Sequence, residues 1–76
     1  MRVRYFASLR ERKGIEEEQV ELLEGETLGA LYLRLCPPIP GGVLPVAYAR
    51  NLTYAGADEV PDDGDEISFL PPIGGG

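Results

Sequence analysis

A single amphipathic helix among strand-like segments is the feature that most constrains the fold of this chain. Apolar residues recur with helical spacing just before a pair of prolines, at Leu28, Leu31, Tyr32 and Leu35. Thr27 is placed to cap the first turn of this helix, and Pro37 with Pro38 ends it. One helix cannot cover both faces of a sheet, so we expect the uncovered face to offer a surface to a partner.

The other periodic segments are typical of short strands bounded by turns. Residues 7–13 instead predict a short helix or turn, which Gly14 stops. The segment 37–45, rich in proline and glycine, predicts a loop. The expected strands are residues 1–6, 19–23, 46–50 and 66–70, with a short edge strand around Tyr54.

Alternation of side chains within these strands predicts which face the core. Arg2 and Arg4 are expected to face water, and Ser68 and Leu70 to point to the open side of the sheet. The residues expected to point into the core are Val3, Tyr5, Val20, Leu22, Ile67 and Phe69.

The order strand, strand, helix, strand, edge strand, strand predicts an α+β roll of the β-grasp (ubiquitin-like) kind. We expect a mixed sheet of four to five strands with one main helix on one face. Residues 1–70 would form this single domain, and residues 71–76 a flexible C-terminal tail.

Composition excludes several classes of function. The 76 residues contain no histidine, which excludes histidine acid–base catalysis and argues against a zinc site. The single cysteine, Cys36, follows a helical pattern and is expected to be a small buried residue rather than a nucleophile. A net charge of −6 argues against nucleic acid and anionic membranes and favours a basic protein partner. With no membrane-span or signal-peptide pattern, we expect a cytoplasmic protein.

Two acidic segments could suggest metal binding or catalysis. Residues 62–66 resemble part of a calcium loop, but Pro61 and Leu70 stand where two ligands are needed, so a tight turn is the better interpretation. Glu16, Glu17 and Glu18 are better explained as a solvated loop than as a catalytic pair. We therefore predict no metal site and no bound cofactor.

The C-terminal tail is the remaining candidate for chemistry. It follows the last strand directly, and its sequence is Pro71-Pro72-Ile73-Gly74-Gly75-Gly76. A frayed end is the simplest interpretation of its glycines. The prolines, however, direct the exit, and the six residues could span roughly 20 Å at about 3.3–3.6 Å per residue. The Gly76 carboxylate is ionised at neutral pH, so it must be activated, for example as an acyl-adenylate, before a nucleophile can attack it.

The two ends of the sequence together resemble the molybdopterin synthase small subunit (MoaD) family. Its members open with a strand followed by Tyr/Phe-Phe-Ala-x-x-Arg-Glu, as does the segment Val3-Arg4-Tyr5-Phe6-Ala7-Ser8-Leu9-Arg10-Glu11. They close with Asp-Gly-Asp-Glu, a hydrophobic strand and Pro-Pro-Val-Ser/Thr-Gly-Gly, which is similar to residues 63–76. Two departures are Gly74, where the family has a hydroxyl residue, and residues 46–51, which match only loosely.

The resemblance implies a sulfur carrier. A ubiquitin-activating-type adenylyltransferase, using ATP and magnesium, would adenylate Gly76, and a sulfur donor would convert it to a thiocarboxylate. The tail would then enter the large subunit of molybdopterin synthase, in a heterotetramer of two small and two large subunits, and donate sulfur to cyclic pyranopterin monophosphate. Gly75 would allow passage, and the large subunit would supply the catalytic groups. The residues expected to bind the partner are Phe6, Leu70, Pro71, Pro72, Ile73, Gly74 and Gly75.

Three alternatives stay open. One is a sulfur carrier of the thiamin-thiazole (ThiS) type, or one that serves tRNA thiolation. Another is a ubiquitin-like modifier attached to lysines of other proteins through Gly76. The third is a β-grasp binding module whose tail is inert.

Overall fold

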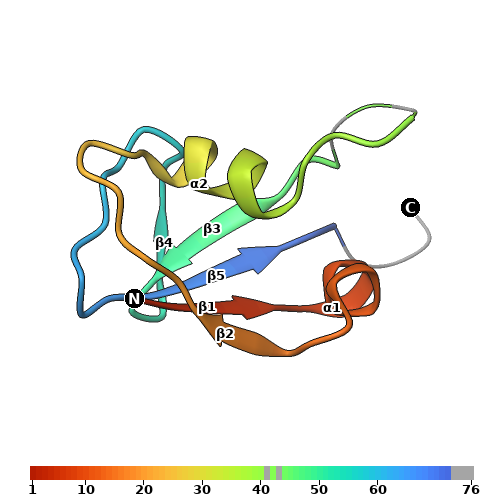
Figure 1. The fold of residues 1–76 in the computed structure, drawn as a ribbon, viewed down its shortest axis with the longest axis horizontal. Coiled ribbons are helices and arrows are strands. Elements are labelled where there is room, and N and C mark those ends of the chain that lie inside the picture. Colours follow the sequence, from red (N-terminus) through yellow and green to blue (C-terminus); the bar gives the residue numbers. More distant parts are fainter. Residues whose placement is uncertain (41, 43, 73–76) are drawn as a thin grey trace.

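The fold is built on one five-stranded sheet. The computed structural model describes residues 1–40, 42 and 44–72. Figure 1 shows the path of the chain through this sheet and its two helices. The elements are β1 (Arg2–Tyr5), α1 (Ala7–Lys13), β2 (Glu17–Gln19), α2 (Leu28–Leu35), β3 (Ala47–Arg50), β4 (Thr53–Ala55) and β5 (Glu66–Leu70).

The last strand lies in the middle of the sheet. The strand order is β2-β1-β5-β3-β4, so β5 pairs with β1 on one side and with β3 on the other. The β1–β5 pair is parallel and the other pairs are antiparallel. This mixed sheet of five strands, with α2 as the main helix, confirms the predicted α+β β-grasp architecture.

The core lies between the sheet and α2, and Phe69 of β5 is at its centre. The ring of Phe69 is fully buried and lies 5.1 Å, centroid to centroid, from that of Tyr32 on α2. Tyr48 of β3 and Tyr5 of β1 approach the same ring at 5.9 and 6.0 Å. Such edge and tilted contacts add to the burial of apolar area. Val3 and Ile67 are also fully buried, so the predicted inner face of the two central strands is confirmed.

The start of α2 and the end of α1 are capped by the residues that the sequence predicts. The hydroxyl of Thr27 accepts a hydrogen bond from the Ala30 amide at 3.2 Å, which caps α2. Gly14 ends α1 with a φ of 75°, a conformation that glycine adopts without strain. Lys13, in the last turn of α1, donates to the carbonyl of Leu35 at 2.9 Å. This bond satisfies a backbone acceptor at the end of α2, where a positive charge is favourable.

The second strand begins and ends earlier than predicted. It covers Glu17–Gln19 rather than residues 19–23. The reason is the register, which pairs Arg2 with Gln19 and brings Met1 opposite Val20. Residues 21–23 therefore find no partner on β1. The predicted direction of Val20 is nevertheless confirmed, because its side chain is buried in the core.

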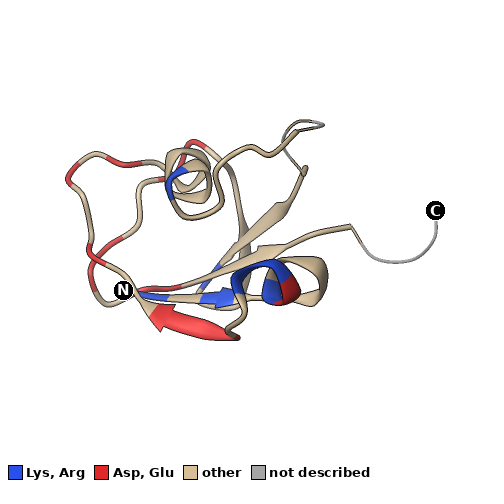
Figure 2. Cartoon of the chain, turned by 45° about the vertical axis from the view of Figure 1, so that its right-hand side comes forward, with Lys and Arg blue, Asp and Glu red and all other residues tan. Residues whose placement is uncertain are grey.

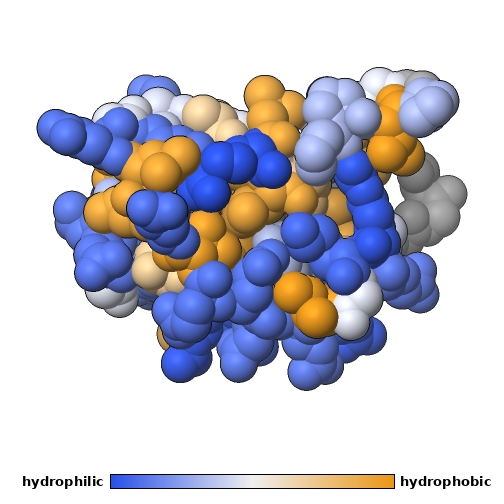
Figure 3. All heavy atoms as spheres, in the orientation of Figure 1, coloured by the Kyte–Doolittle hydropathy of each residue, from blue (hydrophilic) through white to orange (hydrophobic). Residues whose placement is uncertain are grey.

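Charged side chains cover the outer edge of the sheet at β2. Glu17 pairs with Arg2 at 3.9 Å, and both side chains are about half exposed. In the view of Figure 3 the lower margin of the molecule, where β2 runs in Figure 1, is hydrophilic. Charge along an edge strand disfavours pairing with a strand of another chain. The segment expected to be a solvated acidic loop is thus partly a protected edge strand.

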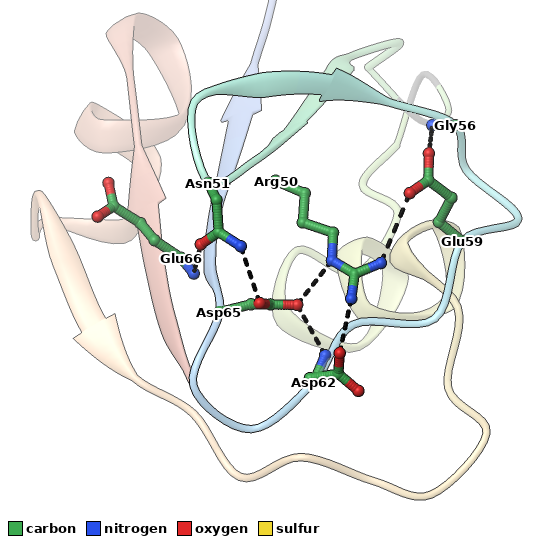
Figure 4. Close-up of polar contacts among 7 residues, drawn as sticks. All are labelled: Arg50, Asn51, Gly56, Glu59, Asp62, Asp65 and Glu66. Atoms are coloured by element: carbon green, nitrogen blue, oxygen red, sulfur yellow. Dashed lines mark hydrogen bonds and ion pairs between the residues drawn. The ribbon is translucent and has the colours of Figure 1, made fainter.

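The acidic turn before β5 is held by Arg50, the last residue of β3 (Figure 4). The Arg50 guanidinium donates to Asp65 at 2.7 Å and to Asp62 at 2.9 Å, and it lies 3.6 Å from Glu59. Asn51 donates to the second oxygen of Asp65 at 2.9 Å. These contacts tie the start of β5 to the end of β3, as the turn interpretation requires.

In the described residues neither helix is long and apolar enough to span a bilayer.

The acidic turn makes a prediction about stability in acid. The pKa of Asp65 is held below its ordinary value of 3.8, first because the Asp62 amide donates to the carboxylate, and also because Asn51 and Arg50 bind it. A lowered pKa stabilises the fold above about pH 4, and this stabilisation is lost as the pH falls through the lowered value. We expect Asp65→Asn to lower the free energy of unfolding at pH 7 and to weaken its fall below pH 4, measured by urea unfolding.

Asp63→Asn is the matched control, because Asp63 lies in the same turn, its side chain is 88% exposed, and its ion pair with the Met1 nitrogen is long, at 3.7 Å, and expected to contribute little. If Asp63→Asn weakened the loss of stability in acid as much as Asp65→Asn does, the role assigned to the hydrogen bonds that Asp65 accepts would be wrong.

Candidate functional site

The candidate site is the apolar end of the open face, where β5 leaves the sheet. Register places Arg4, Ser68, Ala49 and Tyr54 side by side across β1, β5, β3 and β4. One row further along, Leu70 of β5 pairs with Ala47 of β3. The open face therefore changes from charged to apolar along the direction in which β5 runs.

Several apolar side chains surround one shallow hollow at this end, which we call the exit patch. Tyr54, on the edge strand, is 80% exposed, and Leu52 in the adjoining turn is 83% exposed. Large apolar side chains so exposed in one place are typical of an interaction surface. The exit patch comprises Phe6, Ala7, Ala47, Tyr54, Leu70, Pro71 and Pro72, with Leu52 at its margin.

A polar border separates the exit patch from the rest of the open face. The Arg4 guanidinium lies 5.1 Å from the centroid of the Phe6 ring and pairs with Glu66 at 3.4 Å. Ser68 was predicted on the open side and lines a hollow there with Arg4 and Tyr54, but it is only 6% exposed because its neighbours enclose it. Figure 2 shows acidic residues on β2 and on the loops at the end of the sheet where β5 begins. Most of the acidic residues therefore lie away from the exit patch, whereas basic residues of α1 and Arg4 lie near it.

The structure brings together four of the residues predicted from sequence. Phe6, Leu70, Pro71 and Pro72 line the same hollow. Pro71 is buried and Pro72 is exposed, so the chain leaves the domain between them. The other predicted site residues, Ile73, Gly74, Gly75 and Gly76, lie outside the described residues.

Sequence reasoning missed the contribution of the β3–β4 hairpin to this surface. Tyr54 was expected only as the centre of an edge strand, and Leu52 was not singled out. The signal available was an aromatic residue in a short polar edge strand, but the pairing with Ala49 that sets its face comes from the structure. Ala47 carries no signal, since alanine is common at buried and exposed positions alike, and Ala7 was noted only as part of the opening motif.

The hairpin holds Leu52 in a strained backbone conformation. Asn51 and Leu52 form a two-residue turn in which φ is 51° and 69°. Asparagine tolerates the left-handed region, whereas leucine pays a steric penalty there that glycine avoids. A strained residue in a turn with a fully presented apolar side chain points to a function for that side chain.

The alternative sites considered from sequence do not compete with the exit patch. Cys36 is 1% exposed, and burial raises the pKa of its thiol, so it is a poor nucleophile. In the acidic turn the Arg50 guanidinium already occupies the position between Asp62 and Asp65 that a cation would take. Among residues 1–40, 42 and 44–72 no group of three or more Cys, Asp or Glu side chains is arranged to hold a metal ion.

Comparison with known proteins identifies the family. The ThiS family matches residues 3–76. The chain belongs to this family. It is 33% identical, over 81 aligned positions, to the molybdopterin synthase sulfur carrier subunit of Chlamydomonas reinhardtii, with 100% of this chain and 98% of that protein covered. The resemblance to the MoaD family predicted from the two end motifs is therefore confirmed.

Solved structures confirm the fold of this ThiS-family chain. It superimposes with a TM-score of 0.74 on a putative molybdopterin converting factor, subunit 1, from Pyrococcus furiosus, at 28% identity, covering 95% of each chain. It superimposes with a TM-score of 0.77 on SAMP1 from Haloferax volcanii, at 26% identity, covering 100% of this chain and 98% of that one.

The strain at Leu52 can be tested by substitution. We expect Leu52→Gly to raise the free energy of unfolding by up to about 1 kcal/mol, because relief of the left-handed conformation, worth roughly 1–2 kcal/mol, is partly offset by the greater freedom of glycine in the unfolded chain. Leu52→Ala removes the same exposed side chain but keeps the strain, so it should leave stability nearly unchanged. Chemical unfolding of both variants measures the difference, and a Leu52→Gly protein no more stable than Leu52→Ala contradicts the strain.

Proposed function

We propose that this chain is the sulfur-carrying small subunit of a molybdopterin synthase. The observation that carries the proposal is the position of β5. This strand is central in the sheet, is paired on both sides, and leads directly through Pro71 and Pro72 beside an uncovered apolar patch. A tail that starts there is aimed by a rigid element while the patch next to it offers binding area to the protein that receives the tail. The relative from Chlamydomonas bears the corresponding name.

The proposed chemistry takes place on Gly76. A separate adenylyltransferase of the ubiquitin-activating type joins the carboxylate to AMP, using ATP and magnesium and releasing pyrophosphate. A donor that supplies sulfur at the sulfide level then attacks the acyl carbon, the acyl–phosphate C–O bond breaks, AMP leaves, and a thiocarboxylate remains. Glycine suits both steps because its acyl carbon is unhindered. The thiocarboxylate sulfur forms a bond to a carbon of cyclic pyranopterin monophosphate, and hydrolysis of the acyl C–S bond leaves the sulfur there and restores the Gly76 carboxylate.

In this proposal the large subunit covers the exit patch and contributes the catalytic groups. A chain without histidine, with a buried Cys36, depends on its partner for acid–base chemistry. Phe6, Leu70 and Tyr54 are the side chains that the partner would bury, and the glycines Gly74 and Gly75 would pass through its channel. Two small and two large subunits would form the complex, in the cytoplasm.

Removal of Gly76 tests the proposed chemistry. We expect the shortened chain to fold normally but to gain no sulfur, because its new end lies one residue short of the activating site. Intact-mass measurement of protein from its native cells should show an oxygen-to-sulfur exchange in the full chain and none in the variant. Molybdenum-cofactor synthesis that continues with the shortened chain as the sole carrier would show that the main proposal is wrong.

Substitution of Tyr54 tests the proposed interface. Tyr54→Glu places a charge in the exit patch, and we expect it to weaken binding to the large subunit by about tenfold or more, as is usual when an aromatic anchor is lost. Its stability should change by less than about 0.5 kcal/mol, since Tyr54 is exposed. Leu33→Glu is the matched control, because Leu33 is 46% exposed on the outer side of α2. Calorimetric titration that finds equal losses for both variants excludes the exit patch as the interface.

A second candidate function is that of a protein modifier joined to lysines of other proteins through Gly76. The likeness to SAMP1, described in a related structure as small archaeal modifier protein 1, favours this candidate. It uses the same activated glycine, so the two functions are compatible. Proteomic detection of glycyl-lysine branches in the native cells supports the modifier, and their absence alongside a thiocarboxylate supports the carrier alone.

A further inference from the structure

An activated C-terminal glycine can be transferred to any accessible amine or thiol, including those of a second copy of the same chain. In such a transfer the nucleophile forms a bond to the acyl carbon, AMP leaves with the carbon–oxygen bond electrons, and the proton of the nucleophile passes to water. The sequence holds few such nucleophiles: the amine of Lys13, the thiol of Cys36 and the α-amine of Met1. Its other cations are arginines, which stay protonated and do not act as acyl acceptors.

Lys13 is enclosed by contacts from three elements, α2, β2 and β1. Its Nζ donates to the Leu35 carbonyl at 2.9 Å and lies 3.5 Å from a carboxylate oxygen of Glu18. It also lies 5.3 Å from the centroid of the Tyr5 ring, and its side chain is only 23% exposed. The Tyr5 hydroxyl donates to the same Glu18 oxygen at 2.5 Å, which fixes the carboxylate in place. The nitrogen must break these contacts before it can attack.

The other two nucleophiles are also engaged. The Met1 nitrogen donates to the Val20 carbonyl at 3.0 Å in a buried hydrogen bond and lies 3.7 Å from Asp63. The Cys36 thiol is buried, and burial raises its pKa, so little thiolate is present at neutral pH. Each group is therefore held by a different part of the fold.

The exposed arginine Arg10 shows where an accessible lysine could have stood. The Arg10 side chain is 54% exposed on α1 and makes a surface ion pair with Glu16 at 3.3 Å. A lysine could make the same ion pair, but it would also present a free amine to a second copy of the chain.

We propose that the fold withholds the amines and the thiol of this chain from acylation, so that its activated glycine passes to partner molecules and not to other copies of itself. The inference rests on the proposed activation of Gly76. Under this proposal Lys13 helps to determine which molecules accept the glycyl group, because its contacts with Leu35 and Glu18 keep its own amine from reacting. The inference also predicts that, even as a modifier, the chain is attached singly and does not form chains.

The test compares two lysines within one molecule. Arg10→Lys introduces an exposed lysine on the same short helix as Lys13. The folded variant, without an N-terminal tag, is treated with the water-soluble amine reagent sulfosuccinimidyl acetate, and the acetylation rate at each amine is measured by peptide mass spectrometry. We expect the introduced lysine to react at least about tenfold faster than Lys13, because Lys13 must first break a charge-assisted hydrogen bond. In urea the two rates should converge. Equal rates in the folded protein overturn the proposal.

Two further measurements test whether the Glu18 contact restrains Lys13 and whether the glycyl group is transferred between copies of the chain. Glu18→Gln removes the ion pair but keeps a hydrogen-bond acceptor, and it should speed acetylation of Lys13 while the introduced lysine is unaffected. A C-terminal thioester of the full chain, kept alone at high concentration, should hydrolyse as a monomer in the wild type and form amide-linked dimers through the introduced lysine in Arg10→Lys. Wild-type dimers linked through Lys13 overturn the proposal.

These experiments use no adenylyltransferase, sulfur donor or synthase. Their outcome therefore does not depend on whether Gly76 carries sulfur in cells. If Lys13 were acetylated as fast as the introduced lysine, the intact mass could still show sulfur on Gly76. Equally, a slow Lys13 would not require sulfur on Gly76.

Discussion

The buried ring of Phe69 is the contact on which the rest of the structure depends. It joins the central strand β5 to β1 and β3 on either side and to α2 above, through Tyr5, Tyr48 and Tyr32. A domain of this size buries a limited share of its surface, so one well-packed centre contributes a large part of its stability. α2 covers this side of the sheet, and on the opposite side the C-terminal end of β5 borders the exit patch.

The two ends of β5 have different surroundings, polar at its start and apolar at its end. At its start, Arg50 binds Asp62 and Asp65 and fixes the turn that leads into the strand. At its finish, Leu70 and Pro71 lie among apolar side chains with a strained hairpin residue, Leu52, at the margin. Polar contacts within the chain thus secure the entry, while the exit keeps apolar surface for another protein. This division fits the proposed function, in which the reactive end must be both aimed and available.

Most of the fold follows from local sequence patterns. The helix α2 was predictable from its stripe and its Thr27 cap, and β5 from its alternation between a tight turn and two prolines. The limits of β2 were not, because strand length there depends on its register with β1 rather than on its own residues. The same reason explains the missed role of Tyr54. An exposed aromatic residue is visible in the sequence, but the face on which it lies is set by pairing with Ala49.

The part played by Lys13 could not be predicted either. Its neighbour Leu35 lies 22 residues away in sequence, and it meets Lys13 and Glu18 only when α1 packs against the end of α2 and the edge of β2. By contrast, Phe6, Leu70, Pro71 and Pro72 could be chosen as one group from strand alternation and from the family resemblance. The parallel pairing of β1 with β5, which brings them to one end of the sheet, comes from the structure.

The parallel pairing of β1 and β5 also has a mechanical consequence. A partner that draws the tail into a channel pulls on Pro71 along the axis of β5, which is also the direction of the seam with β1. The hydrogen bonds of that seam then resist the load together in shear, instead of opening one after another as they would if the strand were peeled from an edge. On its other side β3 shares the load. If a partner draws in the tail as proposed, this pairing on both sides of β5 opposes unfolding of the domain under the pull.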